Sequence, residues 1–259
     1  MKSFLDMLEN RVSLRRYKDK DIKPSDLNKI IHSAMRAPTA GNLMHYSILV
    51  IKNKEKKKIL SESCDNQSFI AQAPVILIFL ADLQRMYDYF EVCDLKKYCE
   101  NNNMRFKNPN LASLFLGAGD AFIAAQNAVI AAESLGIGSC YIGDLIENYE
   151  LKKDLFNLSQ YTMPLVMLTF GYYPDDFKKR KSNRFNKEYI VFKEEYRRLD
   201  EKELIDMYKR REERIRPDNK LNAENFGQYI YKKKIDSKFF EEMERSLKLM
   251  VIDWLENRE

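Results

Sequence analysis

Residues 117–138, with the sequence GAGDAFIAAQNAVIAAESLGIG, restrict the fold more than any other segment of the chain. Alanine, isoleucine, valine and phenylalanine fill the interior, and Asp120 and Gly136 are residue types that favour a helix start and a helix end. A helix that is apolar nearly all round must be buried, either in the core or between subunits. Its polar members would then need hydrogen-bond partners: Gln126, Asn127 and Glu133.

Four apolar stretches predict strands, and the clearest is APVILIFLAD, a continuous apolar run typical of a strand buried on both faces. The predicted strands are residues 47–52, residues 73–82, the segment SCYIGD as far as Gly143, and the segment PLVMLTFGYYP at 164–174. Helical periodicity predicts helices over residues 2–10, 25–37, 54–63, 151–158 and 236–257. Residues 83–110 are expected to be helical in part and then irregular, and the charge-dense chain after Asp175 to hold a loop, a short strand at 189–192 and a helix.

Several protein classes are disfavoured. No G-x-G-x-x-G follows a predicted strand, so a Rossmann fold is not expected. The four cysteines form no C-x-x-C pair and there are only two histidines, so no metal site is expected. The net charge of +5 is mild and does not demand nucleic acid. No secretory signal is evident and the longest apolar runs reach half a membrane span, which predicts a soluble, cytoplasmic protein with no membrane partner.

Three short motifs are weak when each is taken alone. RVSLRRY at 11–17 has the composition of a solvated basic face, APTAGN at 37–42 that of a turn, and GIGSCYIGD at 136–144 that of a glycine-rich turn. Together, and in this order, they resemble the FMN-dependent nitroreductase family. The tail KRKSNRFNKEYIVFKEEY at 179–196 is similar to the branch that includes the major oxygen-insensitive nitroreductase and the NADPH-flavin oxidoreductases.

The resemblance implies an α+β fold in which a mixed central sheet is sandwiched by helices. It implies a single domain over residues 1–259 that forms a homodimer, with FMN at the interface and each site built from both subunits. Residues 185–259 would be a C-terminal extension that wraps the partner subunit. Residues 83–110 look longer than is usual in the family and would form a lid over the substrate side.

The resemblance also implies which residues bind FMN. Arg11, Ser13 and Arg184 would hold the phosphate, and Arg15 would lie against the pyrimidine edge, where reduced flavin carries negative charge. Gln67 would hydrogen-bond the polar edge of the flavin. The remaining positions would line the rings or the interface: Thr39, Gly41, Asn42, Met44, Tyr141, Ile142 and Gly143. An N–H of Gly143 would donate to N5. No protein group would be catalytic, and His45 would be structural.

The implied reaction passes two electrons from NADPH or NADH to a nitroaromatic, quinone or flavin acceptor by a ping-pong mechanism. The 2′-phosphate of NADPH would bind in the basic run 209–217, for which a solvated helix is the alternative reading: Arg210, Arg211, Arg214 and Arg216. Two other functions stay open, a flavin reductase or FMN-binding protein that serves a partner enzyme, and a basic nucleic-acid-binding protein.

The chain departs from the family pattern at several positions. Met44, His45 and Tyr46 replace a Gln followed by Pro-Trp, and Ser182 stands where the branch often has a basic residue. Asp144 stands where a second glycine is usual. Its carboxylate would lie near the flavin rim, where it would either disfavour anionic substrates or pair with an arginine.

Overall fold

The structure is a computed structural model that describes residues 4–256. The predicted helix over 2–10 therefore begins, and the one over 236–257 ends, outside the described residues. The chain forms two compact units. The first runs to Arg180 and resumes at Met243, and the second is Lys181–Glu242.

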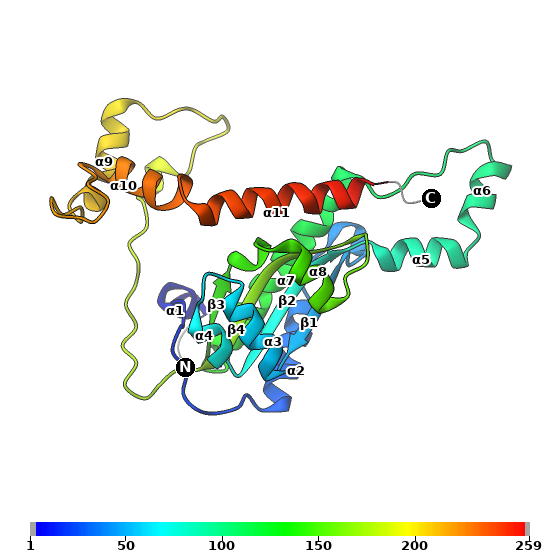
Figure 1. Ribbon diagram of the computed structural model, residues 1–259, viewed down its shortest axis with the longest axis horizontal. Helices are drawn as coiled ribbons and strands as arrows, with labels where there is room; N and C mark the ends of the chain where they lie inside the picture. The colour runs from blue at the N-terminus through cyan, green and yellow to red at the C-terminus, as the bar shows by residue number, and fades with distance from the viewer. Residues whose placement is uncertain (1–3, 257–259) are drawn as a thin grey trace. The chain divides into compact units, whose positions relative to one another are not determined.

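A four-stranded sheet lies at the centre of the first unit (Figure 1). The strands are β1 (Tyr46–Ile51), β2 (Val75–Asp82), β3 (Ile137–Ile142) and β4 (Thr162–Tyr172), in the order β1-β2-β4-β3. All three strand pairs are antiparallel. The expected mixed character is limited to one parallel bridge in the described residues, between Ser13 and Ser139 beside β3. All four predicted strands are present, with bounds that differ by a few residues.

Helices cover both faces of the sheet, so the predicted α+β sandwich is confirmed. Alternate residues of β2 point to opposite faces, as the pleat requires. Val75, Leu77 and Phe79 pack in the core with α2 (Pro24–Met35) and α7 (Leu111–Ser134). Ile76 and Ile78 pack in the second core. Its helices are α3 (Lys54–Glu62), α4 (Ser68–Gln72) and α8 (Tyr149–Phe156).

The long helix α7 begins earlier than predicted. Asn110 caps its start through a capping box with Ser113, and Asp120 is buried within the helix, so the prediction that Asp120 caps it is wrong. The early start has a physical reason, because the Asn110 side chain accepts two backbone N–H bonds of the first turn. Gly136, with φ of 73°, follows the helix end as expected.

One face of α7 packs against α2 and β2, and its small residues are fully buried: Ala121, Ala124, Ala125, Ala128 and Ala132. The three polar side chains predicted to need partners have them within this unit. Asn127 Nδ2 donates to the Ser33 carbonyl, Glu133 accepts from the hydroxyl of Tyr173, and Gln126 accepts from that of Tyr141. By length and composition alone, α7 could span a membrane. From the sequence, apolar runs of only half a membrane span are expected. This longer apolar helix is not evident there, because polar residues interrupt it. Core helices of globular proteins share the property, and α7 packs as one of them.

The remaining helices of the first unit are α1 (Phe4–Asn10), α5 (Gln84–Val92), α6 (Leu95–Asn101) and α11 (Lys238–Leu255), the last of which begins in the second unit. Residues 83–110 are helical and then irregular, as predicted. Tyr87 anchors them by edge contacts to Phe90 and Phe106 and by a ring contact to Tyr161. In α11, Met250 and Trp254 are buried in a third apolar cluster.

The second unit contains a short 3₁₀ turn (Lys187–Tyr189), α9 (Glu201–Glu212), α10 (Phe226–Ile230) and a π turn (Tyr231–Ile235). The strand expected at 189–192 is absent, because the described part of this unit offers no neighbouring strand with which it could pair. A capping box of Asp200 and Glu203 starts α9. A bidentate contact with Arg197 lowers the pKa of Glu203 to about 2.

Candidate functional site

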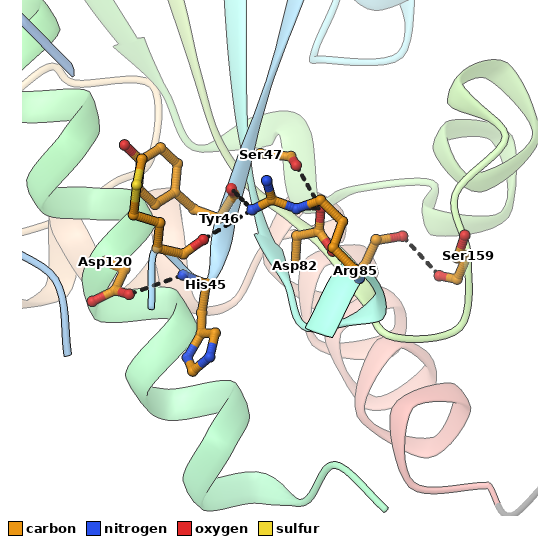
Figure 2. A network of polar contacts seen from close by, with 9 residues as sticks. His45, Tyr46, Ser47, Asp82, Arg85, Asp120 and Ser159 are labelled. Atoms are coloured by element: carbon orange, nitrogen blue, oxygen red, sulfur yellow. Dashed lines mark hydrogen bonds and ion pairs between the residues drawn. The ribbon is translucent and has the colours of Figure 1, made fainter. Parts of the chain in front are cut away.

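The loop at residues 37–46 takes its shape from α7. Gly41, Asn42 and Met44 have positive φ values of 57°, 58° and 51°. Glycine adopts such values freely and asparagine often does, whereas they are uncommon for methionine. The carboxylate of Asp120 accepts the backbone N–H of Ala40 at 2.9 Å. It also accepts the backbone N–H of His45 at 3.1 Å (Figure 2). A buried acceptor on a core helix therefore fixes both ends of the strained stretch.

Arg85, at the start of α5, holds the same loop from the other side. Its Nη2 donates to the Met44 carbonyl at 2.9 Å and to the Tyr46 carbonyl at 2.7 Å. Figure 2 shows the guanidinium of Arg85 beside Tyr46. Its Nε pairs with the buried Asp82 at 3.1 Å, and Ser47 donates to the same carboxylate. Residues 83–110 are thus tied to the loop. Sequence reasoning missed Arg85, because nothing distinguishes one arginine within a charged segment.

The N-terminal motif runs beside β3. Leu14 is fully buried and its N–H donates to the Ser139 carbonyl at 2.9 Å. Because neighbouring residues of an extended segment alternate, Ser13 and Arg15 point away from that core. Burial raises the pKa of the Cys140 thiol on β3, and the nearby side chains of Arg15 and Ser13 partly oppose the rise. The motif and β3 therefore meet at their side chains as well as at their backbones.

The end of β3 presents a ring and an open stretch of backbone. The hydroxyl of Tyr141 donates to Gln126 of α7 at 3.1 Å, and burial raises the pKa of Tyr141 to about 12 although Arg11 opposes the rise. The side chain of Ile142 packs in the core, so this residue can meet a ligand only through its backbone. A Cβ added at Gly143 would meet nothing within 4 Å.

Gln67 lies at the same end of β3. It precedes α4, and its Nε2 donates to the Cys64 carbonyl at 3.0 Å and to the carboxylate of Asp144. The centroid of the Phe69 ring, two residues later, lies 6.0 Å from the guanidinium carbon of Arg15. The structure shows one partner of the Asp144 carboxylate, the side-chain amide of Gln67.

Arg184 and three of the four other candidate arginines come together within the second unit. They line a hollow of about 220 Å³ together with Phe185, Tyr189 and Asp206. The guanidinium of Arg211 lies 4.0 Å from the centroid of the Phe185 ring, with Phe226 and Tyr208 at greater distances. Arg216 is separate from this group and lines a different hollow with Pro217 and Asn222.

His45 is buried, and its Nε2 lies 3.4 Å from the Met86 sulfur. No carboxylate contacts the ring among the described residues. Residues 4–256 also contain no cluster of three or more histidine, cysteine, aspartate or glutamate side chains arranged to hold a metal ion.

Comparison with known proteins decides the family. The model of the nitroreductase family matches residues 8–172. The chain belongs to the nitroreductase family. That match spans the N-terminal motif, the loop, Gln67, the end of β3 and the whole sheet.

Relatives of this nitroreductase come from several bacteria. It is 34% identical over 201 residues to an FMN reductase [NAD(P)H] of Bacillus subtilis, covering 78% of this chain and 77% of the relative. It is 30% identical over 205 residues to an oxygen-insensitive NADPH nitroreductase of Salmonella typhimurium, covering 79% of each. The solved structure of NfrA2 from B. megaterium is 30% identical, with a TM-score of 0.76 over 96% of this chain and 98% of that one.

Proposed function

We propose that this nitroreductase passes two electrons from NADPH or NADH, through FMN, to a small-molecule acceptor of the nitroaromatic, quinone or flavin type. The single observation that carries this is the meeting of the N-terminal motif with the open end of β3 in a chain of this family. The relatives named FMN reductase and NADPH nitroreductase support the cofactor and the electron donor. We also propose that the protein is a soluble enzyme located in the cytoplasm.

The residues present at the end of β3 suit FMN. Arginine and serine donors match a phosphate, and the open space above Gly143 leaves room for a flat ring. Bound FMN supplies the hydride chemistry. Arg11 and Ser13 would hold its phosphate, Arg15 would stabilise the charge of the reduced ring, and the Gly143 N–H would face N5. The loop would contribute contacts from Thr39, Gly41, Asn42 and Met44, and the end of β3 would add Tyr141 and the Ile142 backbone.

Replacing Arg15 with alanine is expected to raise the dissociation constant for FMN about tenfold, because a charge-assisted contact worth about 1.5 kcal/mol is lost. Titration of the apoprotein with FMN measures the change. Arg16→Ala is the matched control, since the Arg16 side chain is bound instead to both oxygens of Asp176, at 2.8 and 2.9 Å. Equal affinities of wild type and Arg15→Ala would remove Arg15 from the site.

The hollow of the second unit would bind phosphate groups. Arg184 would contribute to the FMN phosphate, and Arg210 and Arg214 would contact the 2′-phosphate of NADPH. Arg211 is stacked among aromatic rings, so we propose that it shapes the hollow as well as adding charge. Arg216, on its own hollow, is the weakest of the candidates.

The outer face of α7 supports a homodimer. It exposes large apolar side chains at helical spacing: Phe115, Leu116, Phe122 and Ile123. A row of this kind on a soluble protein favours contact with another protein surface. We propose that the second copy covers it, that each FMN site uses both copies, and that residues 83–110 act as a lid. Of the predicted extension 185–259, we propose that the part before Met243 wraps the partner, because Met250 and Trp254 of α11 are buried in the first unit of their own chain.

Phe122→Lys should weaken the dimer by about tenfold or more, because a large side chain that is 47% exposed in one copy loses its burial against the other. Light scattering after size-exclusion chromatography, at several concentrations, measures the effect. Val50→Lys, on the edge strand β1, is the control and should leave the dimer intact. A Phe122→Lys protein with the wild-type mass profile would place the dimer contact elsewhere.

The absorption spectrum of the purified protein tests the proposed function. Flavin bands that bleach on anaerobic addition of NADPH or NADH are expected. Comparing turnover of a nitroaromatic, a quinone and free FMN then separates a nitroreductase from a flavin reductase or an FMN-binding protein that serves another enzyme. A colourless protein that FMN cannot reconstitute would refute the proposal. Family membership already disfavours nucleic-acid binding.

A further inference from the structure

Gln67 is held at every polar group except one. Its backbone N–H donates to the Ser61 carbonyl at 3.1 Å, and its own carbonyl accepts from the Ser61 hydroxyl at 2.8 Å. Its side-chain nitrogen donates to the Cys64 carbonyl at 3.0 Å and to the carboxylate of Asp144. No group of residues 4–256 donates to its Oε1. This oxygen is the part of the amide left for a ligand.

The two partners of the side-chain nitrogen are both acceptors. A carbonyl and an ionised carboxylate accept hydrogen bonds and cannot donate them. Rotating the side-chain amide by half a turn would place Oε1 against the Cys64 carbonyl oxygen and the Asp144 carboxylate. Neither of these two groups could then donate a hydrogen bond to it. The two N–H groups of Gln67 therefore stay on Cys64 and Asp144, and a side chain that can normally act as donor or acceptor is restricted to accepting.

The position of Asp144 is itself fixed. The fully buried Cys64 thiol donates to the Asp144 carbonyl at 3.4 Å, so the two partners of Gln67 are linked to each other. Burial raises the pKa of Cys64 to about 12, which keeps the thiol protonated and able to donate. Asp144 directly follows Gly143, the residue with open space above it.

We infer that Asp144 is a positioning residue which fixes Gln67 as a hydrogen-bond acceptor, so that this edge of the site selects a ligand with an imide N–H. The inference rests on the proposed function, in which the ligand is FMN and the N–H is that of N3. A flavin methylated at N3 lacks this donor and should be rejected. The departure of this chain from the Gly-Gly pattern is then a determinant of ligand selection.

The test compares the dissociation constants of FMN and 3-methyl-FMN, titrated into apoprotein. Wild type should prefer FMN by about tenfold, the value of one hydrogen bond to a well-placed acceptor. Asp144→Asn, whose amide can donate to Oε1 and turn the glutamine, should lower that preference to about twofold. Gln67→Leu should do the same, and the double variant should be no worse than either single one, since the residues act as a unit.

Asp154→Asn, on the exposed surface of α8, is the matched control and should keep the wild-type preference. A methyl group that merely collides would weaken binding equally in every variant, and this result would overturn the inference. A wild type that binds both flavins equally well would also overturn it while leaving the proposed function intact. A wild type that binds neither flavin would refute both.

Discussion

Asp120→Ala is expected to lower the free energy of unfolding by about 3 kcal/mol and the melting temperature by about 6–12 °C. The substitution removes the acceptor of two loop N–H groups, those of Ala40 and His45. These donors would lie against α7 without a partner, and an unpaired buried donor costs about 1–3 kcal/mol. Because the same bonds shape the loop, FMN should also be retained less well. Thermal unfolding and the flavin content of the purified protein measure the two effects.

Asp120→Asn should cost less than Asp120→Ala, because the amide keeps one acceptor oxygen. Asp154→Asn, on the exposed surface of α8, serves as the control and should change the melting temperature little. If Asp120→Ala melted like wild type, the two bonds would not support the loop. If it melted early but kept all its flavin, the loop would not take part in the site.

Gly143→Val is expected to weaken FMN binding about hundredfold while leaving stability nearly unchanged. Gly143 has φ of −80° and ψ of −24°, values that a valine accepts without strain, and its added side chain would enter open space. We place the flavin ring in that space, so the valine methyl groups would overlap a bound ring. The overlap would make the free energy of FMN binding less favourable by about 2–3 kcal/mol. Titration with FMN and thermal unfolding of the apoprotein measure the two quantities.

A graded series strengthens this test. Gly143→Ala should weaken FMN binding less than Gly143→Val, because a methyl group intrudes less. Gly138→Ala gives the opposite pattern, since a Cβ there would come within 2.6 Å of Leu14 and 2.8 Å of Tyr173 and should reduce stability directly. Undiminished FMN binding in Gly143→Val would show that the ring lies elsewhere.

Much of the fold was predictable because its signals are local. β2 was evident as a continuous apolar run, and Gly136 marked the end of α7. The start of α7 was not predictable, because Asn110 and Asp120 are both good capping residues. Which of them caps the helix depends on the loop that Asp120 contacts. The strand expected at 189–192 failed for a related reason, since a strand needs a partner that local sequence does not reveal.

The candidate site was predictable as a set of motifs rather than as a set of contacts. The N-terminal motif and β3 do lie together, as the family resemblance implies. Their partners were not foreseeable: Arg85 reaches the loop from a charged helix, and Asp144 binds Gln67 across more than seventy residues of sequence. Such pairings depend on tertiary structure, for which a single sequence carries no periodic signal.

The grip of Asp120 on the 37–46 loop concerns main-chain amides and ignores the side chains that those residues carry. A library that randomises position 40, which is partly exposed, should therefore yield many folded members, provided that proline, which lacks the required N–H, is left out. Position 45 is different, because its side chain is buried as well as its N–H bonded, and it should tolerate few replacements.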